Sequence, residues 1–369
     1  MSATVPTELR GRPPGRHGPA RRCGRPVLAT VGVLALLGAG AGAGTAGAAS
    51  HVHVQPIVNF AIPSPALGCG GAVALGGGAV RIPMTVSTVA GQVAEAVNVC
   101  IDGRGPYPFV VDSGAGESII DAHLAARLDL PHAGPTSAIA GVGCEATSRP
   151  VTVPTWSVEG VPLASQTLTA ATLPDFGGHG QPVGLLGSDV FSRFGSFRVD
   201  FTAGTLTFPG PEGPVPGASR VKALSGPAPP PVLTGGAASA TVPVSVDLTP
   251  GVVSVNVRVR VGRGTYEFVV DTGSSQSVVA SSIARKWHLA HTDQAQRQTT
   301  VCSVITTPLV HSGAWAVQGV QLTPQLVDAA SFGPVSSDGT EGLLGSDVLK
   351  EFGWVVFDYT AGRLVLGAS

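Results

Sequence analysis

Two short segments of the sequence end an apolar run on an aspartate and then continue with small residues. They are FVVDSGAGESII (109–120) and FVVDTGSSQSVV (268–279), which place Asp112 and Asp271 before a hydroxyl residue and a glycine. A lone carboxylate at the end of a buried strand is costly to remove from water. The small residues lower this cost, because they let the backbone turn tightly and bring N–H and hydroxyl donors beside the carboxylate.

The chemistry open to the two aspartates depends on how close together they lie. If the two segments face each other about a pseudo-twofold axis, Asp112 and Asp271 become neighbours. Two carboxyls that close cannot both ionise easily, so they share a proton and titrate as a unit. The ionised member can then take a proton from a water, while the protonated member hydrogen-bonds a carbonyl. Such a pair can hydrolyse an amide without a covalent intermediate.

The rest of the sequence favours this arrangement, because the chain is an internal duplication. Three blocks recur in the same order at an offset of 158 or 159 residues, which chance does not produce. Besides the aspartate segments, they are WSVEGVPL (156–163) with WAVQGVQL (315–322), and GLLGSDVFSRFGSFRVDFTAGTLTF (184–208) with GLLGSDVLKEFGWVVFDYTAGRLVL (342–366). The sequence predicts one domain at 75–209 and another at 241–369, joined by a Pro/Gly/Ala-rich linker at 210–240 and preceded by an irregular arm at 49–74.

Each copy has the local signals of a mainly β domain with two short helices. The runs VNVCID and VNVRVRV are typical of strands, GRG of a hairpin turn, and the apolar run before each aspartate of the next strand. Short helices are predicted within 119–130 and 280–289. Ser188 and Ser346 are predicted as N-caps of a second helix in each copy. Asp189 and Asp347 follow in its first turn, where the helix dipole stabilises an acid, so we expect a structural role for them.

With these motifs in place, both copies resemble retropepsin-type aspartic proteases. The resemblance rests on D-[ST]-G after FVV and on an apolar-apolar-glycine motif later in each copy. It implies a mainly β fold, in which two retropepsin-like, closed β-barrel domains form an intramolecular pseudo-dimer. It also implies that Asp112 and Asp271 are the catalytic pair.

The resemblance assigns supporting roles to further residues. Ser113 and Thr272 are expected to cross-link the two turns through their hydroxyls, and Gly114 and Gly273 to shape them. The apolar-apolar-glycine motif is expected to pack beside each catalytic turn as a ψ-shaped loop, formed by Leu185, Leu186, Gly187, Leu343, Leu344 and Gly345.

The family also has a flap, a hairpin that lies over the catalytic turn, and each copy offers a candidate. The candidates are IAGVGCEATS (139–148) and TTVCSVITT (299–307), which would exclude water and hold a peptide as an added strand. Their tips contain Gly141, Val142, Gly143, Cys144, Val301 and Cys302. A bond between the two flap cysteines would restrict or regulate access, with Cys69–Cys100 as the companion pair. From the sequence, the four cysteines after the N-terminal segment allow three connectivities, and free buried thiols are the alternative.

Composition and the N-terminus bear on location and partners. The chain is 43% hydrophobic and 12% charged with a net charge of −1, so it can bury a core and lacks the basic surface of a nucleic-acid-binding protein. Residues 1–48 combine an arginine-rich start, an apolar run at 27–37 and an A-x-A pattern at 46–48. This predicts a secretory signal peptide or, if it is not cleaved, a signal anchor. We therefore expect a secreted or extracytoplasmic protein.

Together, the resemblance and the N-terminal signal pattern predict an exported aspartic endopeptidase that acts on peptide or protein substrates as a monomer, with no metal or organic cofactor. Two alternatives stay open. Each copy could instead pair with a copy from another chain, because the linker is long. A catalytically inactive peptide-binding or cell-surface module could also keep the fold, with the two aspartates serving only to cap their turns.

Overall fold

The computed structural model describes residues 30–31, 53–55, 68–174, 181–213, 219–221, 239–249, 252–333 and 339–367. The predicted signal or anchor segment, most of the 49–74 arm and most of the linker therefore lie outside the described residues. Within the described ranges, no helix is both long enough and apolar enough to cross a membrane.

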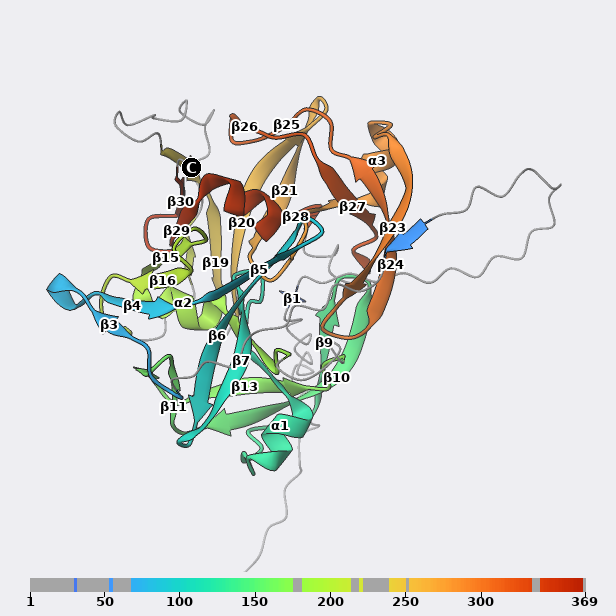
Figure 1. Ribbon diagram of the computed structural model, residues 1–369. Helices are drawn as coiled ribbons and strands as arrows, with labels where there is room; N and C mark the ends of the chain where they lie inside the picture. The colour runs from blue at the N-terminus through green and yellow to red at the C-terminus, as the bar shows by residue number, and fades with distance from the viewer. Residues whose placement is uncertain are drawn as a thin grey trace, which may run out of the picture.

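Two similar mixed sheets hold most of the strands, one sheet for each copy (Figure 1). Copy one, in cyan to green, contributes β5 (Thr85–Val89), β6 (Gln92–Ile101), β7 (Arg104–Asp112), β8 (Ile119–Asp121), β9 (Ser137–Gly141), β10 (Cys144–Val153), β11 (Trp156–Val158), β12 (Val161–Leu163), β13 (Gln166–Ala171) and β14 (Gly184–Gly187). Copy two, in yellow to red, contributes β19 (Ser245–Thr249), β20 (Val252–Val261), β21 (Gly264–Asp271), β22 (Val278–Ala280), β23 (His291–Thr299), β24 (Val304–His311), β25 (Trp315–Val317), β26 (Val320–Leu322), β27 (Leu326–Ala330) and β28 (Gly342–Gly345). The expected mainly β, two-copy architecture is confirmed, although no pairing among the described strands closes either sheet into a barrel.

Three short strands from outside the predicted domains extend these sheets. They are β1 (Thr30–Val31), which pairs with β9, β2 (His53–Gln55), which pairs with β23, and β17 (Ser219–Val221), which pairs with β19.

The sequence pattern explains why these segments are strands. In β20, VVSVNVRVRV, every second residue is a buried valine, and the residues between them are more exposed. This period of two puts one face of the strand in the core and the other toward solvent. In β6, QVAEAVNVCI, nearly every residue is buried, because both of its faces are covered. The turn between β20 and β21 and the one between β6 and β7 fall on the predicted GRG segments.

A third sheet belongs to both copies and joins them. It contains β3 (Val73–Ala74), β4 (Val80–Pro83), β15 (Ser196–Asp200), β16 (Thr205–Phe208), β18 (Ala240–Pro243), β29 (Trp354–Asp358) and β30 (Arg363–Leu366). At its centre β15 pairs antiparallel with β29, and Arg198 lies opposite Val356, its equivalent in the other copy. Phe197 and Phe357 stack across this seam with ring centroids 4.7 Å apart. The pseudo-twofold axis therefore passes through the middle of the shared sheet.

In the described part of the chain, four short α-helices complete the fold, two in each copy. They are α1 (Ala122–Arg127), α2 (Ser188–Phe191), α3 (Ser281–Lys286) and α4 (Ser346–Leu349), with 3-10 turns η1 (Gly76–Gly78), η2 (Ser192–Phe194) and η4 (Lys350–Phe352). Both α1 and α3 fall within the ranges predicted for them. The prediction that Ser188 and Ser346 are N-caps is wrong: Gly187 and Gly345 hold that position, and the two serines are the first helical residues.

Candidate active site

The two candidate aspartates end equivalent strands. Asp112 is the last residue of β7 and Asp271 the last of β21. Each strand pairs in parallel with the apolar-apolar-glycine strand of its own copy, so that Gly187 lies beside Asp112 and Gly345 beside Asp271. A Cβ on either glycine would come within 2.8 Å of a backbone oxygen of the turn that follows the aspartate, so only glycine fits. The apolar-apolar-glycine motif of each copy therefore lies directly beside its aspartate.

Backbone donors hold one oxygen of each carboxyl. Asp112 Oδ1 accepts hydrogen bonds from the N–H groups of Gly114 (3.0 Å) and Ala115 (2.8 Å). Asp271 Oδ1 accepts from those of Gly273 (2.9 Å) and Ser274 (3.1 Å). The D-[ST]-G turn therefore fixes the orientation of its own carboxyl in both copies.

The hydroxyl residues after the aspartates interlock the two turns. The Ser113 N–H donates to Thr272 Oγ1 (2.9 Å), and the Thr272 N–H donates to Ser113 Oγ (3.0 Å). Each hydroxyl also donates to a carbonyl of the other copy, Ser113 Oγ to Val270 O (2.8 Å) and Thr272 Oγ1 to Val111 O (2.7 Å). All of these groups are buried, so the four bonds fix the two turns relative to each other.

The interlocked turns bring the two carboxyls together. A Cβ on Gly114 would lie 2.7 Å from Asp271 Oδ2, and a Cβ on Gly273 would lie 2.5 Å from Asp112 Oδ2. Each glycine therefore leaves the space that the other copy's carboxyl occupies. Among the described residues, no group donates a hydrogen bond to the buried Oδ2 of either aspartate.

Burial and proximity both oppose ionisation of the pair. Burial raises the pKa of Asp112 to about 6, although backbone donors and Asp271 lower it. Burial raises the pKa of Asp271 well above its ordinary value, and the neighbouring charge of Asp112 raises it further. The two carboxyls therefore hold a proton in a pH range where ordinary aspartates are ionised.

The sequence analysis did not assign a second layer of residues, behind the turns, to the site. Ser188 Oγ donates to the Ser113 carbonyl (2.8 Å) and also contacts the Tyr359 hydroxyl (2.9 Å). In copy two, Ser346 Oγ lies 3.1 Å from the Thr272 carbonyl and 2.8 Å from a carboxyl oxygen of Glu95. The serines carried a signal, because they recur at the same place in both copies, whereas Tyr359 and Glu95 do not recur.

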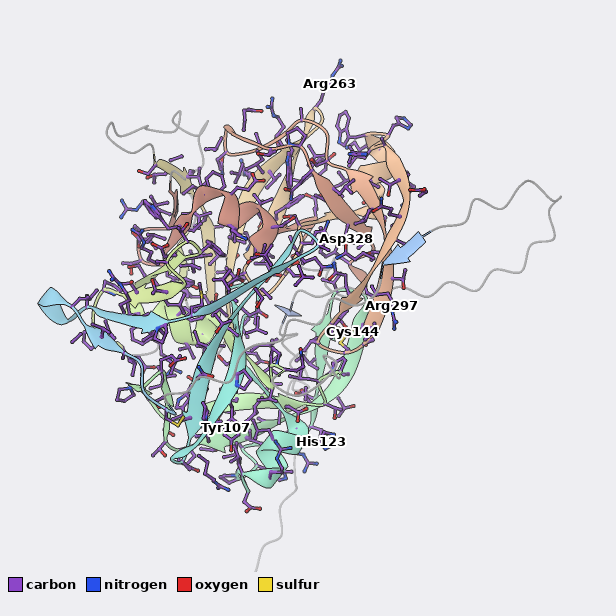
Figure 2. All side chains as sticks on the ribbon, viewed as in Figure 1. Tyr107, His123, Cys144, Arg263, Arg297 and Asp328 are labelled. Carbon is purple, nitrogen blue, oxygen red and sulfur yellow. A yellow bond between two sulfur atoms is a disulfide. The ribbon has the colours of Figure 1, made fainter. Side chains whose placement is uncertain are left out.

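The two candidate flaps are hairpins whose tips are joined by a disulfide. The β9–β10 and β23–β24 hairpins meet at Cys144 and Cys302, and Figure 2 shows Cys144 and its sulfur where these hairpins come together. Cys69 and Cys100 form the second disulfide, so both candidate pairs named in the sequence analysis are present. The flap cysteines are 158 residues apart and hold equivalent places in the repeat. The flap disulfide therefore lies on the pseudo-twofold axis that relates Asp112 to Asp271.

Each flap tip is buried in the apolar wall of the other copy. Val142, from the copy-one tip, packs with Val269, Val278, Ile305 and Leu343 of copy two. Val301, from the copy-two tip, packs with the copy-one residues Val110, Ile119 and Leu185.

These two apolar clusters flank the dyad, because Val110 and Val269 each lie two residues before an aspartate. A backbone bond from the Gly143 N–H to the Phe332 carbonyl (3.3 Å) also holds the first tip on copy two. The two flap tips thus cover the apolar surfaces on both sides of the aspartates.

The helix acids have the structural environment expected of them. Asp189 accepts from the Ser118 hydroxyl (2.7 Å), and Asp347 accepts from the Ser277 hydroxyl (2.7 Å). These two serines in turn accept from the ψ-loop N–H groups of Gly187 and Gly345. The helix acids therefore brace the ψ loops and do not face the dyad oxygens.

Comparison with known proteins agrees with this geometry. No curated protein matches the chain significantly. The family model described as Aspartyl protease matches residues 97–190 and again 255–348, which together make up just over half of the chain. Each match begins in the strand that pairs with the aspartate-bearing strand (β6 or β20) and ends in the short helix after the ψ loop (α2 or α4). The chain therefore belongs to the aspartyl protease family and carries two copies of its domain in tandem.

Proposed function

We propose that this protein is an exported aspartic endopeptidase with one active site, formed between its two repeats. One observation carries the proposal: two buried carboxyls face each other across interlocked turns, each with one oxygen that no described group hydrogen-bonds. Two disulfides are typical of an oxidising, extracytoplasmic environment, which supports export.

The chemistry follows from the shared proton. One carboxylate accepts a proton from a water held between the Oδ2 atoms, and that water attacks the peptide carbonyl carbon. The other carboxyl donates a hydrogen bond to the carbonyl oxygen and so stabilises the charge that develops there. Collapse of the tetrahedral species transfers a proton to the leaving nitrogen, and the pair regains its single proton. The backbone bonds to Oδ1 keep both carboxyls in place throughout.

The flaps determine when a substrate can reach this pair. Val142 and Val301 pack against the apolar surfaces on which substrate side chains on either side of the scissile bond would bind. Both flap tips therefore have to move off these surfaces before a substrate can bind. The Cys144–Cys302 disulfide links the tips over the dyad and opposes their separation. We therefore propose that the oxidised protein is a low-activity form, and that reduction of this disulfide admits extended, apolar peptide segments.

The decisive experiment is peptide cleavage by the reduced, secreted form from pH 3 to 9, for wild type, Asp112→Asn and Asp271→Asn. If both single variants lose activity, the two carboxyls act as one dyad within the chain. If each variant keeps a substantial share, the copies pair between chains. Because both pKa values are raised, the activity maximum is expected nearer neutral pH than the range where ordinary aspartates titrate.

An inactive peptide-binding module is the competing function. A statine-type transition-state mimic separates the two, because its hydroxyl binds tightly only to a carboxyl pair that shares a proton. Tight binding by wild type with much weaker binding by Asp271→Asn supports the enzyme. Equal, weak binding by both proteins, with no cleavage after reduction, supports the module.

A further inference from the structure

The serines behind the two catalytic turns have different partners, although the turns themselves are nearly symmetric. Ser188 contacts the Tyr359 hydroxyl, and Ser346 contacts the Glu95 carboxyl. In the repeat, Tyr359 corresponds to Phe201, since both precede T-A-G in the closing hairpins. The strand register makes Val255 the counterpart of Glu95, because Val97 faces Phe109 just as Val257 faces Phe268. Each copy thus supplies a polar partner to the serine of the other copy. At the position equivalent to that partner, the other copy has an apolar residue.

Each serine acts on an aspartate through a single peptide unit. The Thr272 carbonyl that Ser346 contacts belongs to the same peptide plane as the Gly273 N–H, which donates to Asp271 Oδ1. The Ser113 carbonyl and the Gly114 N–H stand in the same relation to Asp112. A change at either serine therefore alters the hydrogen bond that holds the adjacent catalytic carboxyl.

Glu95 is placed to act as a neutral donor in this chain of contacts. Its side chain is fully buried, and among the described residues its Oε1 has no hydrogen-bond partner. Burial raises the pKa of Glu95 to about 8; the hydrogen bond with Ser346 and the charge of Lys350 lower it, and the charge of Asp347 raises it. The Lys350 ammonium bonds to Thr88 and not to Glu95.

The other elements packed against this part of β6 add few charges. The β5 and β11 segments contain no titratable residue. The β7 segment carries Arg104 and Tyr107 toward its far end and Asp112 of the dyad itself. The α4 helix also packs on β6 and carries Asp347, whose charge raises the pKa of Glu95. Burial raises the pKa of Asp347 itself to about 6, so Asp347 loses its proton at a lower pH than Glu95.

We infer that Glu95 is a positioning residue, whose protonated carboxyl keeps Ser346 on the Thr272 carbonyl and so keeps the Gly273 N–H on Asp271. The inference rests on the proposed function. It makes the copy-two half of the site sensitive to alkali. The copy-one half is not, because burial raises the pKa of Tyr359 above its ordinary value and the phenol stays a donor.

The proton count explains the sensitivity. The Ser346 hydroxyl carries one hydrogen. When Glu95 is protonated, its O–H donates to Ser346 Oγ, and Ser346 donates to the Thr272 carbonyl. When Glu95 loses its proton to solvent, the carboxylate becomes the stronger acceptor and takes the serine hydrogen. The Thr272 carbonyl is then left without its donor, and the Thr272–Gly273 peptide can rotate away from Asp271.

Kinetics of the reduced protein test this inference through the shape of the pH profile. In wild type, log kcat/KM above neutral pH should approach a slope of −2, because the dyad and Glu95 each lose a proton. Glu95→Gln keeps a donor at every pH and should keep a slope of −1. The ratio of kcat/KM for Glu95→Gln to kcat/KM for wild type should be about tenfold higher at pH 9 than at pH 5.5. The reason is that only about a tenth of the Glu95 carboxyls in wild type remain protonated at pH 9.

Two further variants control the kinetic result. Ser346→Ala removes the relay, that is, the hydroxyl that connects Glu95 to the Thr272 carbonyl. It should also give a slope of −1, with lower activity at all pH values. Tyr359→Phe removes a donor that does not ionise in this range, so it should lower activity by one factor throughout and keep the wild-type slope. A slope of −2 in Glu95→Gln, with wild-type melting behaviour, overturns the inference.

An NMR titration gives a readout that does not need cleavage. The Gly273 amide proton should shift upfield near pH 8 in wild type and not in Glu95→Gln, while the Gly114 amide of the same molecule serves as the internal reference. If this shift appears but no form of the protein cleaves peptides, the relay stands and the proposed function fails. If both glycine amides behave alike in wild type, Glu95 has no positioning role, whatever the activity.

Discussion

Gly114 of copy one lies directly against the carboxyl of Asp271 in copy two, and Gly273 has the same relation to Asp112. A Cβ on Gly114 would stand 2.7 Å from Asp271 Oδ2 and nearer still to its Cγ. Real Cβ atoms do not approach other heavy atoms this closely. The glycine of each D-[ST]-G turn is therefore required by the aspartate of the other copy, and neither half forms the site alone.

Gly114→Ala should abolish activity while leaving most of the fold intact. The added methyl displaces Asp271 from its place opposite Asp112, and a shift of about 1 Å at a reacting group can cost about 100-fold in rate. The measurement is kcat of the reduced variant together with its thermal melt. Gly210→Ala is the matched control, because a Cβ there meets nothing within 4 Å. Activity of Gly114→Ala within a few-fold of Gly210→Ala would contradict this account of the dyad.

Thr272→Val should destabilise the protein and lower its activity, because it removes the hydroxyl that bonds Val111 and Ser113 across the two copies. Leaving these buried groups unpaired costs about 1–3 kcal/mol each. Chemical denaturation measures the loss. Thr272→Ser is the control, since copy one already uses a serine at the equivalent Ser113. If Thr272→Ser loses as much as Thr272→Val, the hydroxyl bonds are not what holds the turns together.

Reducing agent should activate the protein through the flap disulfide alone. Cys302→Ser removes that tether, so this variant is expected to cleave peptides without reductant and to gain nothing from it. Cys69→Ser removes the other disulfide, which lies away from the flaps, and should still need reductant. Peptide cleavage with and without a thiol distinguishes these cases. Full activity of oxidised wild type would show that the tethered flaps do not block the site.

Folding stability should fall as the pH rises through the neutral range. Burial raises the pKa of Asp328 to about 7 and that of Asp347 to about 6. Between the ordinary carboxyl range and these values the folded state holds protons that the unfolded chain has released, so each further rise in pH favours unfolding.

Asp328→Asn tests this dependence at one group. Thr307 and Gln298 both hydrogen-bond the Asp328 carboxyl, which Figure 2 places in copy two. The melting temperature of wild type should fall from pH 5 to pH 8, and the variant should fall less. The difference corresponds to at most about 4 kcal/mol, at about 1.4 kcal/mol per pKa unit. A wild-type melting temperature that rises over this range would contradict the raised pKa values.

The positions of Ser188 and Ser346 could not be predicted from the local sequence alone. Serine before a short helix favours the N-cap, and the neighbouring residues give no reason to expect otherwise. In the folded chain each hydroxyl instead contacts a buried carbonyl of the D-[ST]-G turn, in a segment about 75 residues earlier in the sequence. A buried carbonyl that would otherwise lack a donor outweighs the modest gain of capping a four-residue helix.

By itself, the sequence determined the duplication, the mainly β character, the two D-[ST]-G turns and the ψ-loop glycines. These features are encoded over short stretches, as strand periodicity and turn residues, and the repeat presents each of them twice. Only the tertiary structure decided the shared third sheet, the burial of each flap valine in the other copy, and the pairing of Ser188 with Tyr359 and of Ser346 with Glu95. The two serine contacts, for example, join residues 171 and 251 positions apart. They follow from how two nearly identical halves dock about an axis, and no local propensity records that docking.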